Sequence, residues 1–268
     1  IRALRTGPTL EGIFEEKIAA LEGGIGAVAT SSGMAAQFLT FAALVGAGDH
    51  VVASSALYGG TLTQLDVTLR RFGVDTTFVK SDKAEDFKAA ITDKTKFVYA
   101  EMVSNPACQI GDIEALAKVA HDAGLPLVID STVATPYLVR PIEFGADIVL
   151  HSATKFLGGH GTTLGGVIVE SGKFNWSNGK FPMMTEPVPS YGGVSWWENF
   201  GEFGFLTKVR VEQLRDIGAS LSAMSAFLLV QGVETLPQRM RDHVVNAKVV
   251  AEWLESDSRI AWVKYSGL

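Results

Sequence analysis

Short apolar runs recur along the chain, and most of them are separated by segments with helical spacing. The runs predict strands at residues 27–29, 50–54, 76–79, 97–101, 127–129, 148–150 and 167–169. Most are continuously apolar, which indicates strands that are buried on both faces. Buried strands that alternate with helices are typical of an α/β fold. We therefore predict a mostly parallel, seven-stranded sheet flanked by helices.

The segments between these runs carry helix signals. Thr9 precedes apolar residues at helical spacing up to the stop at Gly23-Gly24, and Asp112 is a predicted N-cap of a helix that ends at Gly124. The pattern also predicts helices at residues 34–44, 62–72, 84–91, 206–230 and 236–254, and the start of a strand at 261–264. Residues 171–204 are irregular and rich in Trp, Phe, Pro and Gly, a composition too aromatic for a flexible linker. Ordered segments of this length are often functional.

Composition narrows the function classes. The net charge of −6 and the absence of a basic run argue against a nucleic-acid partner. A single cysteine, Cys108, excludes a disulfide within the chain and favours a reducing, cytoplasmic location. The five histidines lack metal-ligand spacing, so we expect no metal site. The uncharged stretch Gly23–Gly48 is long enough for a membrane span, but polar residues interrupt it, so we predict a strand, a loop and a helix there.

The ends of the sequence carry two further expectations. The first residues are charged and lack an apolar region, so no signal peptide is expected. Residue 1 is Ile rather than Met, which suggests that the natural start lies upstream.

Chemically suggestive residues follow the predicted strands. In an open α/β sheet, ligands bind at the carboxyl ends of the strands. Those ends are followed by Ser31-Ser32-Gly33-Met34, Tyr58, Asn105-Pro106, Asp130-Ser131-Thr132 and Ser152-Ala153-Thr154-Lys155. A lysine for a Schiff base, an acid for a pyridine nitrogen, a stacking ring and a helix start for a phosphate together meet the needs of pyridoxal phosphate. Each residue alone is more often a turn, cap or packing residue, so the prediction depends on their joint placement.

Three rival motifs are set aside. Ser152-Ala-Thr-Lys155 matches the S-x-x-K pattern of serine acyl hydrolases, but the accompanying SDN and KTG elements are absent. Gly24-Ile-Gly26-Ala-Val-Ala29 fits a loose dinucleotide fingerprint, yet it precedes a strand instead of following one. A P-loop is absent.

Several stretches resemble the Cys/Met-metabolism family of fold-type I pyridoxal-phosphate enzymes. In the family's order, they are Ile18–Gly24, Ser31–Ala36, Tyr58–Thr61, Glu101–Pro106, Asp130–Pro136 and His151–Lys155. The resemblance implies that Lys155 forms the Schiff base and is catalytic, that Asp130 pairs with the pyridine nitrogen, and that Tyr58 stacks on the ring and takes part in catalysis. It places the remaining cofactor-binding residues at the phosphate (Gly33, Met34, Ser152 and Thr154) and near the ring (Asn105 and Thr132).

Within the family, the chain is most similar to the O-acetylhomoserine sulfhydrylases. Supporting stretches are Phe174-Asn-Trp176, Phe203-Gly-Phe205 and Gln231–Met240, and Gly60 replaces the cysteine of methionine γ-lyases. The resemblance implies a cytoplasmic homotetramer that carries out γ-replacement on O-acetyl-L-homoserine with sulfide or a thiol, giving L-homocysteine and acetate in methionine biosynthesis. Cystathionine γ-synthase, O-succinylhomoserine sulfhydrylase and methionine γ-lyase remain alternatives, as does a non-enzymatic or acyl-hydrolase protein of the same fold class.

Two departures from the family pattern bear on the domain division. The family's Tyr-x-Arg, which reaches a neighbouring subunit's phosphate, has no match in Arg2–Thr9, where Arg5 is the substitute candidate. The arginine for the substrate carboxylate belongs to a C-terminal domain and is expected beyond Leu268. We therefore expect a cofactor-binding large domain at 1–232 with an incomplete N-terminal arm, and the start of a truncated small domain at 233–268.

Overall fold

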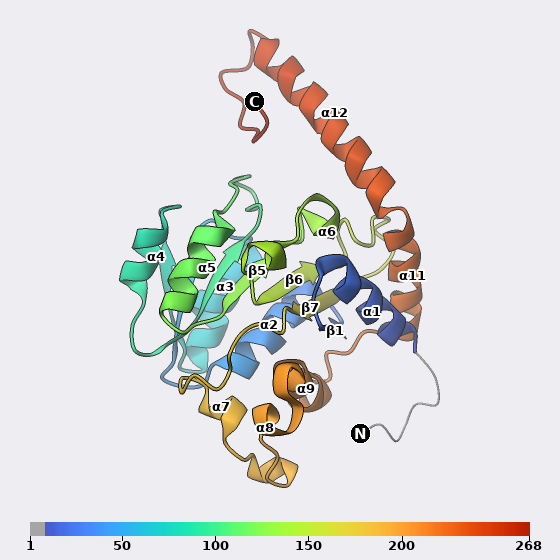
Figure 1. Ribbon diagram of the computed structural model, residues 1–268. Helices are drawn as coiled ribbons and strands as arrows, with labels where there is room; N and C mark the ends of the chain where they lie inside the picture. Colours follow the sequence, from blue (N-terminus) through green and yellow to red (C-terminus); the bar gives the residue numbers. More distant parts are fainter. Residues whose placement is uncertain (1–8) are drawn as a thin grey trace.

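One mixed sheet organises the chain in the computed structural model, which describes residues 9–268 (Figure 1). Its strands lie in the order β1-β7-β6-β5-β4-β2-β3. Their bounds are Gly26–Thr30 (β1), His50–Ser54 (β2), Asp75–Val79 (β3), Thr95–Glu101 (β4), Leu127–Asp130 (β5), Ile148–Ser152 (β6) and Gly166–Glu170 (β7). Every neighbouring pair is parallel except the two that β7 makes with β1 and β6. The predicted seven-stranded, mostly parallel sheet is confirmed.

Helices cover both faces of the sheet (Figure 1). The longer ones are Leu10–Glu22 (α1), Gly33–Leu44 (α2), Ala84–Ala90 (α4), Ile113–Asp122 (α5), Ala223–Glu234 (α11) and Leu236–Ser256 (α12). The short ones are Gly59–Thr63 (α3), Thr135–Leu138 (α6), Pro182–Thr185 (α7), Trp196–Phe200 (α8), Gly204–Lys208 (α9) and Arg215–Ile217 (α10). Turns of π-helix at Gln64–Leu69 and Val209–Leu214 continue α3 and α9, and 3₁₀ turns lie at Pro141–Phe144, Pro189–Tyr191 and Gly201–Phe203.

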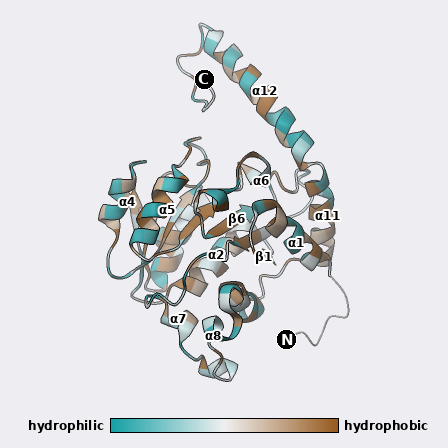
Figure 2. Ribbon diagram, in the orientation of Figure 1, coloured by the Kyte–Doolittle hydropathy of each residue, from teal (hydrophilic) through white to brown (hydrophobic). Residues whose placement is uncertain are grey.

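The core has two layers because successive strand residues point to opposite faces. On β4, Phe97 and Tyr99 join one layer, whereas Val98 and Ala100 join the other. Figure 2 shows this apolar centre as the brown strands between helices of mixed colour. The sheet is therefore buried on both faces, as its continuous apolar runs predict.

The predicted helix signals are mostly confirmed. The Thr9 hydroxyl accepts a hydrogen bond from the Gly12 amide, and the Asp112 carboxylate accepts one from the Ala115 amide, so both residues cap their helices. Gly23 ends α1 in the left-handed conformation, with φ of 76°. The uncharged stretch from Gly23 folds into β1, a turn and α2. Among residues 9–268, no helix combines the length and the apolar character that crossing a membrane requires.

Two predictions in the second half are wrong. The expected helix at 206–230 is broken, because Gly218 adopts φ of 79° and Ser220 then forms a bridge with Thr30 on the edge strand. Ser222 caps the new helix, α11. The expected strand at 261–264 is absent, because none of the strands in residues 9–268 lies beside this segment, where Trp262 is 76% exposed. The domain boundary near residue 232 stays a prediction, although α12, which begins at Leu236, extends away from the body (Figure 1).

The irregular segment 171–204 and α9 build an aromatic cluster of Phe174, Trp176, Phe181 and Phe205. The Trp176 ring stacks on Phe205 at 5.3 Å between centroids and meets Phe174 edge-on at 4.7 Å. Its indole N–H donates to the Glu170 carboxylate at 3.0 Å. Glu170 pairs with Gly26 and Ile148, which begin β1 and β6. The aromatic cluster therefore seals the edge of the sheet at which the parallel strands begin.

Candidate active site

A cavity of about 690 Å³ opens at the other edge of the sheet, where the parallel strands end. This size is ordinary for a small-molecule site. All nine residues that the sequence assigns to the cofactor line it: Gly33, Met34, Tyr58, Asn105, Asp130, Thr132, Ser152, Thr154 and Lys155. Other lining residues include Gln37, Glu101, Phe156, Leu164 and His243. The structure thus brings together side chains that the sequence separates by more than a hundred positions.

The start of α2 forms one wall of the cavity. Ser32 is the N-cap and accepts a hydrogen bond from the Ala35 amide, so Gly33 and Met34 are the first helical residues. Amides in the first turn of a helix have no carbonyl partner within it and favour an anion. A Cβ on Gly33 would lie 2.5 Å from Cβ of Ser152. Only glycine therefore lets this helix start pack against the end of β6, where the predicted phosphate ligands Ser152 and Thr154 lie.

A buried carboxylate lies on the cavity wall at the end of β5. Asp130 is 9% exposed and accepts hydrogen bonds from Nε2 of Gln37 at 3.1 Å and from the Thr132 amide at 2.9 Å. Gln37 is itself fixed, because its Nε2 reaches the Tyr99 hydroxyl and its Oε1 accepts from Thr61. Among residues 9–268, no lysine or arginine forms an ion pair with Asp130. A buried carboxylate without a cationic partner suits a protonated ring nitrogen.

A second carboxylate joins two loops of the site. Oε1 of Glu101 accepts from the Tyr58 amide at 2.6 Å, and Oε2 accepts from the Asn105 amide at 3.0 Å. Burial raises the pKa of Glu101 to about 7; the amide of Tyr58 opposes this shift, Asp130 adds to it, and the amide of Asn105 opposes it. The Tyr58 side chain is 49% exposed, so its ring is available to stack on a ligand.

Lys155 follows β6 on a loop that is fixed at several points. Its amide donates to the Ser152 carbonyl, and the Ser152 amide donates to Oγ1 of Thr132 at 2.8 Å. The Arg239 guanidinium donates to the Phe156 carbonyl at 2.7 Å and to the Leu157 carbonyl at 3.3 Å. The Lys155 side chain is exposed, and its amine has no hydrogen-bond or ion-pair partner in the described part of the chain. The amine is thus available on a restrained backbone.

Sequence reasoning missed three polar residues of this cavity. Gln37 holds Asp130, Glu101 holds the two loops, and His243 reaches the cavity from α12, with its ring 5.4 Å from that of Phe156. Gln37 carried a usable signal, because a lone polar residue on a buried helix needs a partner. Arg5 lies outside the described residues. In residues 9–268, no group of three or more acidic, His or Cys side chains could hold a metal ion.

Comparison with known proteins identifies the family. The model of the family described as Cys/Met metabolism PLP-dependent enzymes matches residues 4–268. The chain belongs to this family. Its fold-type I architecture and its dependence on pyridoxal 5′-phosphate follow, as the sequence resemblance predicts. The cavity fits this cofactor, because it offers a helix start for the phosphate and, within residues 9–268, a buried carboxylate without a cationic partner and an amine without a partner.

Curated members of the Cys/Met metabolism family include close relatives of the chain. Sulfhydrylase FUB7 of Fusarium oxysporum f. sp. lycopersici is 56% identical over 97% of this chain and 60% of its own length. O-acetyl-L-homoserine sulfhydrylase of Leptospira meyeri is 49% identical over 97% of this chain and 61% of its own length. The chain therefore spans about 60% of the length of the curated relatives it matches.

Solved structures in the same family superpose closely. A putative O-acetylhomoserine (thiol)-lyase of Campylobacter jejuni matches with a TM-score of 0.93 and 35% identity, over 98% of this chain and 64% of the other. That structure contains N′-pyridoxyl-lysine-5′-monophosphate, a lysine joined to the cofactor. O-acetylhomoserine sulfhydrylase of Wolinella succinogenes matches with a TM-score of 0.86 and 35% identity, over 97% of this chain and 72% of the other.

Proposed function

We propose that the protein catalyses γ-replacement on O-acetyl-L-homoserine, in which sulfide or a thiol displaces acetate and L-homocysteine forms with sulfide. The observation that most supports this proposal is that Lys155, Asp130 and Tyr58 line one cavity. The chain is also 49% identical to the O-acetyl-L-homoserine sulfhydrylase of Leptospira meyeri. The reaction belongs to methionine biosynthesis in the Wolinella succinogenes relative, and we propose the same role here. The partners are thus an amino-acid substrate and a sulfur donor.

The proposed chemistry needs an electron sink and a mobile base. When bound, pyridoxal phosphate supplies the electron sink for a negative charge beside the amino group of the substrate. The Lys155 amine first holds the cofactor and then, once released and neutral, moves protons at Cα and Cβ of the substrate. Because the amine has no partner in residues 9–268, no ion pair must break before it acts.

The remaining residues bind and orient in this proposal. Asp130 accepts the N–H of the pyridine ring, and Gln37 keeps that carboxylate aimed at the cavity. Tyr58 stacks on the ring and Asn105 lies near its phenolic oxygen, while Thr132 lies beside the ring. The phosphate meets the amides of Gly33 and Met34 and the Ser152 hydroxyl, and the Thr154 hydroxyl joins them by turning from the Gly165 carbonyl, to which it donates at 3.2 Å.

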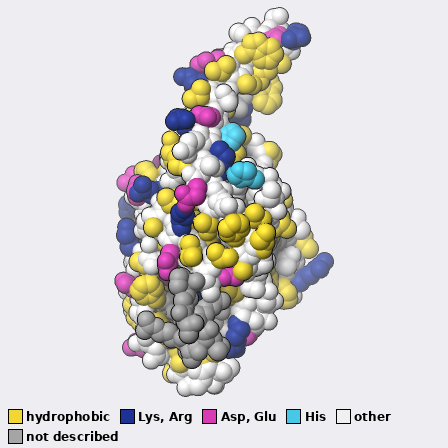
Figure 3. Space-filling model, turned by 90° about the vertical axis from the view of Figure 1, so that its right-hand side faces the viewer, with side chains coloured by type: hydrophobic (Ala, Val, Ile, Leu, Met, Phe, Trp, Pro, Cys, Tyr) yellow, Lys and Arg dark blue, Asp and Glu magenta, His cyan; other side chains and the backbone are white. Residues whose placement is uncertain are grey.

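We further propose that the protein is a cytoplasmic homotetramer, as the family resemblance implies. The face that α1 and α11 help to form supports association of subunits. Figure 3 shows hydrophobic side chains gathered on this face. Large apolar side chains on these two helices are exposed: Leu10, Ile13, Leu21, Met224 and Phe227. Gathered apolar groups on a surface mark interaction sites.

A substrate panel on the full-length protein tests the activity. O-acetylhomoserine or O-succinylhomoserine is supplied with sulfide or cysteine, methionine is supplied alone, and each product is identified by mass. We expect homocysteine from O-acetylhomoserine and sulfide as the fastest reaction. Cystathionine as the main product would identify a cystathionine γ-synthase, and breakdown of methionine alone would identify a γ-lyase. A protein that binds the cofactor but converts none of these substrates would contradict the proposal.

A further inference from the structure

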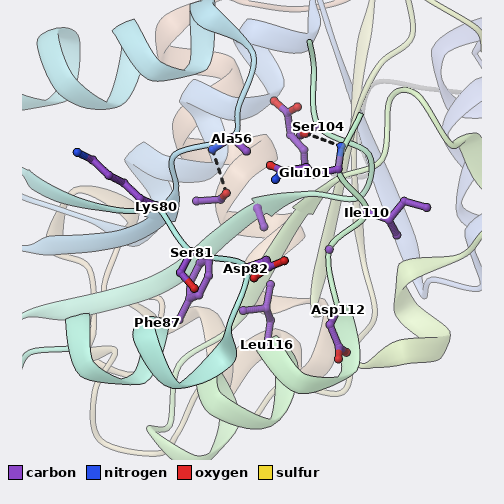
Figure 4. A pocket seen from close by; sticks show the side chains of 14 residues that line it. Ala56, Lys80, Ser81, Asp82, Phe87, Glu101, Ser104, Ile110, Asp112 and Leu116 are labelled. Atoms are coloured by element: carbon purple, nitrogen blue, oxygen red, sulfur yellow. Dashed lines mark hydrogen bonds between the residues drawn. The ribbon is translucent and has the colours of Figure 1, made fainter. Parts of the chain in front are cut away.

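Glu101 occupies an unusual position between two cavities. On one side it lines the 690 Å³ cavity described above. On the other it lines a small cavity of about 40 Å³ whose polar residues include Lys80, Asp82 and Asp112. Figure 4 shows this second cavity, with the Glu101 side chain rising between Ala56 and Ser104. The Glu101 side chain is therefore part of the wall between the 690 Å³ cavity and the small cavity at the N-terminal ends of α4 and α5.

Each oxygen of this carboxylate holds a different loop. Tyr58 follows β2 and Asn105 follows β4, so the two amide contacts at 2.6 and 3.0 Å tie the ends of adjacent strands together. An ionised carboxylate accepts at both oxygens, whereas a glutamine amide accepts at one and donates at the other. The side chain is 8% exposed and lies in register with Asp130 on the next strand. The neighbouring Asp130 disfavours a charged Glu101, whereas the two backbone amides favour it. The contacts to the amides are therefore what suits a carboxylate to this position.

We propose that Glu101 is a positioning residue, which holds the Tyr58 ring and the Asn105 side chain at the cofactor by accepting the backbone N–H groups of both residues. The inference rests on the roles proposed above for Tyr58 and Asn105 at the ring. Because both contacts are to backbone amides, they fix the backbone positions of Tyr58 and Asn105, from which the side chains extend. The Tyr58 ring is half exposed, so this restraint on its backbone matters for its orientation.

The test measures cofactor binding to the full-length protein without any substrate. In Glu101→Gln, one amide loses its acceptor and faces an N–H₂ group instead. We expect the Kd for pyridoxal phosphate to rise about 10-fold, because binding must then order the side chain that the lost hydrogen bond no longer holds in place. We also expect weaker visible circular dichroism per bound cofactor, because the ring is less firmly oriented.

Glu170→Gln is the matched control. Glu170 is a buried strand-end carboxylate with a raised pKa, but it lies at the opposite edge and outside both cavities. This variant should bind the cofactor as the wild type does. A purely structural Glu101 would give a different result: Glu101→Gln would lower the free energy of unfolding of the cofactor-free protein and leave both cofactor measurements at wild-type values. That result would overturn the proposal.

Glu101→Asp decides the question if Glu101→Gln does not fold. Aspartate keeps the charge but is one methylene shorter, so it reaches one amide and not both. A Kd about 10-fold above the wild type, as for Glu101→Gln, supports the proposal, because this variant also leaves one loop unrestrained; a wild-type Kd and dichroism overturn it. Since no measurement uses O-acetylhomoserine, a failed sulfhydrylase assay would leave this inference unaffected. Wild-type cofactor binding by the Glu101 variants would likewise leave the proposed sulfhydrylase activity unaffected.

Discussion

The two edges of the sheet place buried carboxylates in opposite settings. At the edge where the parallel strands end, Glu101 and Asp130 face a cavity that Lys155 also lines. At the edge where they begin, Glu170 accepts from the Trp176 indole beneath packed aromatic rings. Burial raises the pKa of Glu101 to about 7 and of Glu170 to about 8. A perturbed carboxyl group therefore does not identify the functional edge; the cavity beside it does.

Removing the lysine should give the largest effect and leave the opposite edge untouched. Lys155→Ala should lower turnover by about 10³-fold or more, because the base for proton transfer is lost. The Lys155 side chain is exposed, so the free energy of unfolding should change by less than about 0.5 kcal/mol. Borohydride reduction followed by peptide mass analysis measures the covalent link to the cofactor. Lys248→Ala, on the exposed surface of α12, is the control and should keep the label; a labelled Lys155→Ala protein would refute the assignment.

Removing the central indole of the aromatic cluster should produce the reverse result. Trp176 is 1% exposed, so Trp176→Ala should lower the free energy of unfolding by about 3–5 kcal/mol through lost packing. Urea denaturation measures this loss, and cofactor titration at a temperature where the variant is folded should give the wild-type Kd. A Kd that rises along with the loss of stability would show that the two edges are coupled.

The pH dependence of stability should report the sealed carboxyl group. Burial is the main reason that the pKa of Glu170 is raised in the folded state to about 8, from its ordinary value of 4.5. The folded protein therefore keeps this proton at pH values where the unfolded chain has lost it. Its contribution to stability is complete below about pH 4.5 and is lost as the pH rises towards about 8, by at most about 1.4 kcal/mol per pH unit.

Glu170→Gln separates this contribution from that of Glu101, whose pKa is shifted in the same direction. Both proteins contain Glu101, so its effect cancels when the wild type and the variant are compared. The wild type should lose stability relative to Glu170→Gln between pH 5.5 and 8 in urea denaturation. Parallel curves for the two proteins over this range would contradict the assignment.

A small change beside Tyr58 should have the weakest effect. A Cβ on Gly60 would lie 2.6 Å from Cε1 of Tyr58, so Gly60→Ala must displace the ring. Since the ring is half exposed and can turn, we expect the Kd for pyridoxal phosphate to rise only about 3-fold, less than overpacking in a closed core would cause. Gly59→Ala is the control, because its Cβ would meet nothing within 4 Å. Equal effects in both variants would argue against a role for the ring.

Much of the carboxyl-end edge could be predicted from the sequence because its residues follow strands directly. Asp130 and Lys155 come at or just after short apolar runs, and parallel strands bring such positions together. Glu101 ends the predicted strand 97–101 in the same way, but neither it nor Gln37 gave a pattern that indicates its partners. Gln37 meets Asp130 across 93 positions, and Glu101 meets Tyr58 across 43. Contacts at such separations depend on how helices and loops pack, which local spacing does not record.

The sealed edge was harder to predict for a different reason. Trp176 lies in an irregular segment and Phe205 in the short helix α9, so neither has enough regular neighbours for spacing to indicate which face is buried. The aromatic composition of residues 171–204 suggested function, but none of these residues lines the 690 Å³ cavity. The break at Gly218 carried a usable signal, because a glycine followed by Ser220 and Ser222 combines a helix end with a new N-cap.

The antiparallel pairing of β6 with β7 has a consequence for how the enzyme acquires its cofactor. Ser152 pairs with Gly166, and three hydrogen bonds between Thr154 and Gly165 close the intervening loop. Lys155 thus lies on a hairpin loop that is closed by contacts within the loop itself. Tyr58 and Asn105 lie instead on connections that cross from one parallel strand to another. The backbone that carries the amine is consequently in place before any ligand arrives. Cofactor loading should then be a simple bimolecular encounter, with a rate proportional to the pyridoxal phosphate concentration.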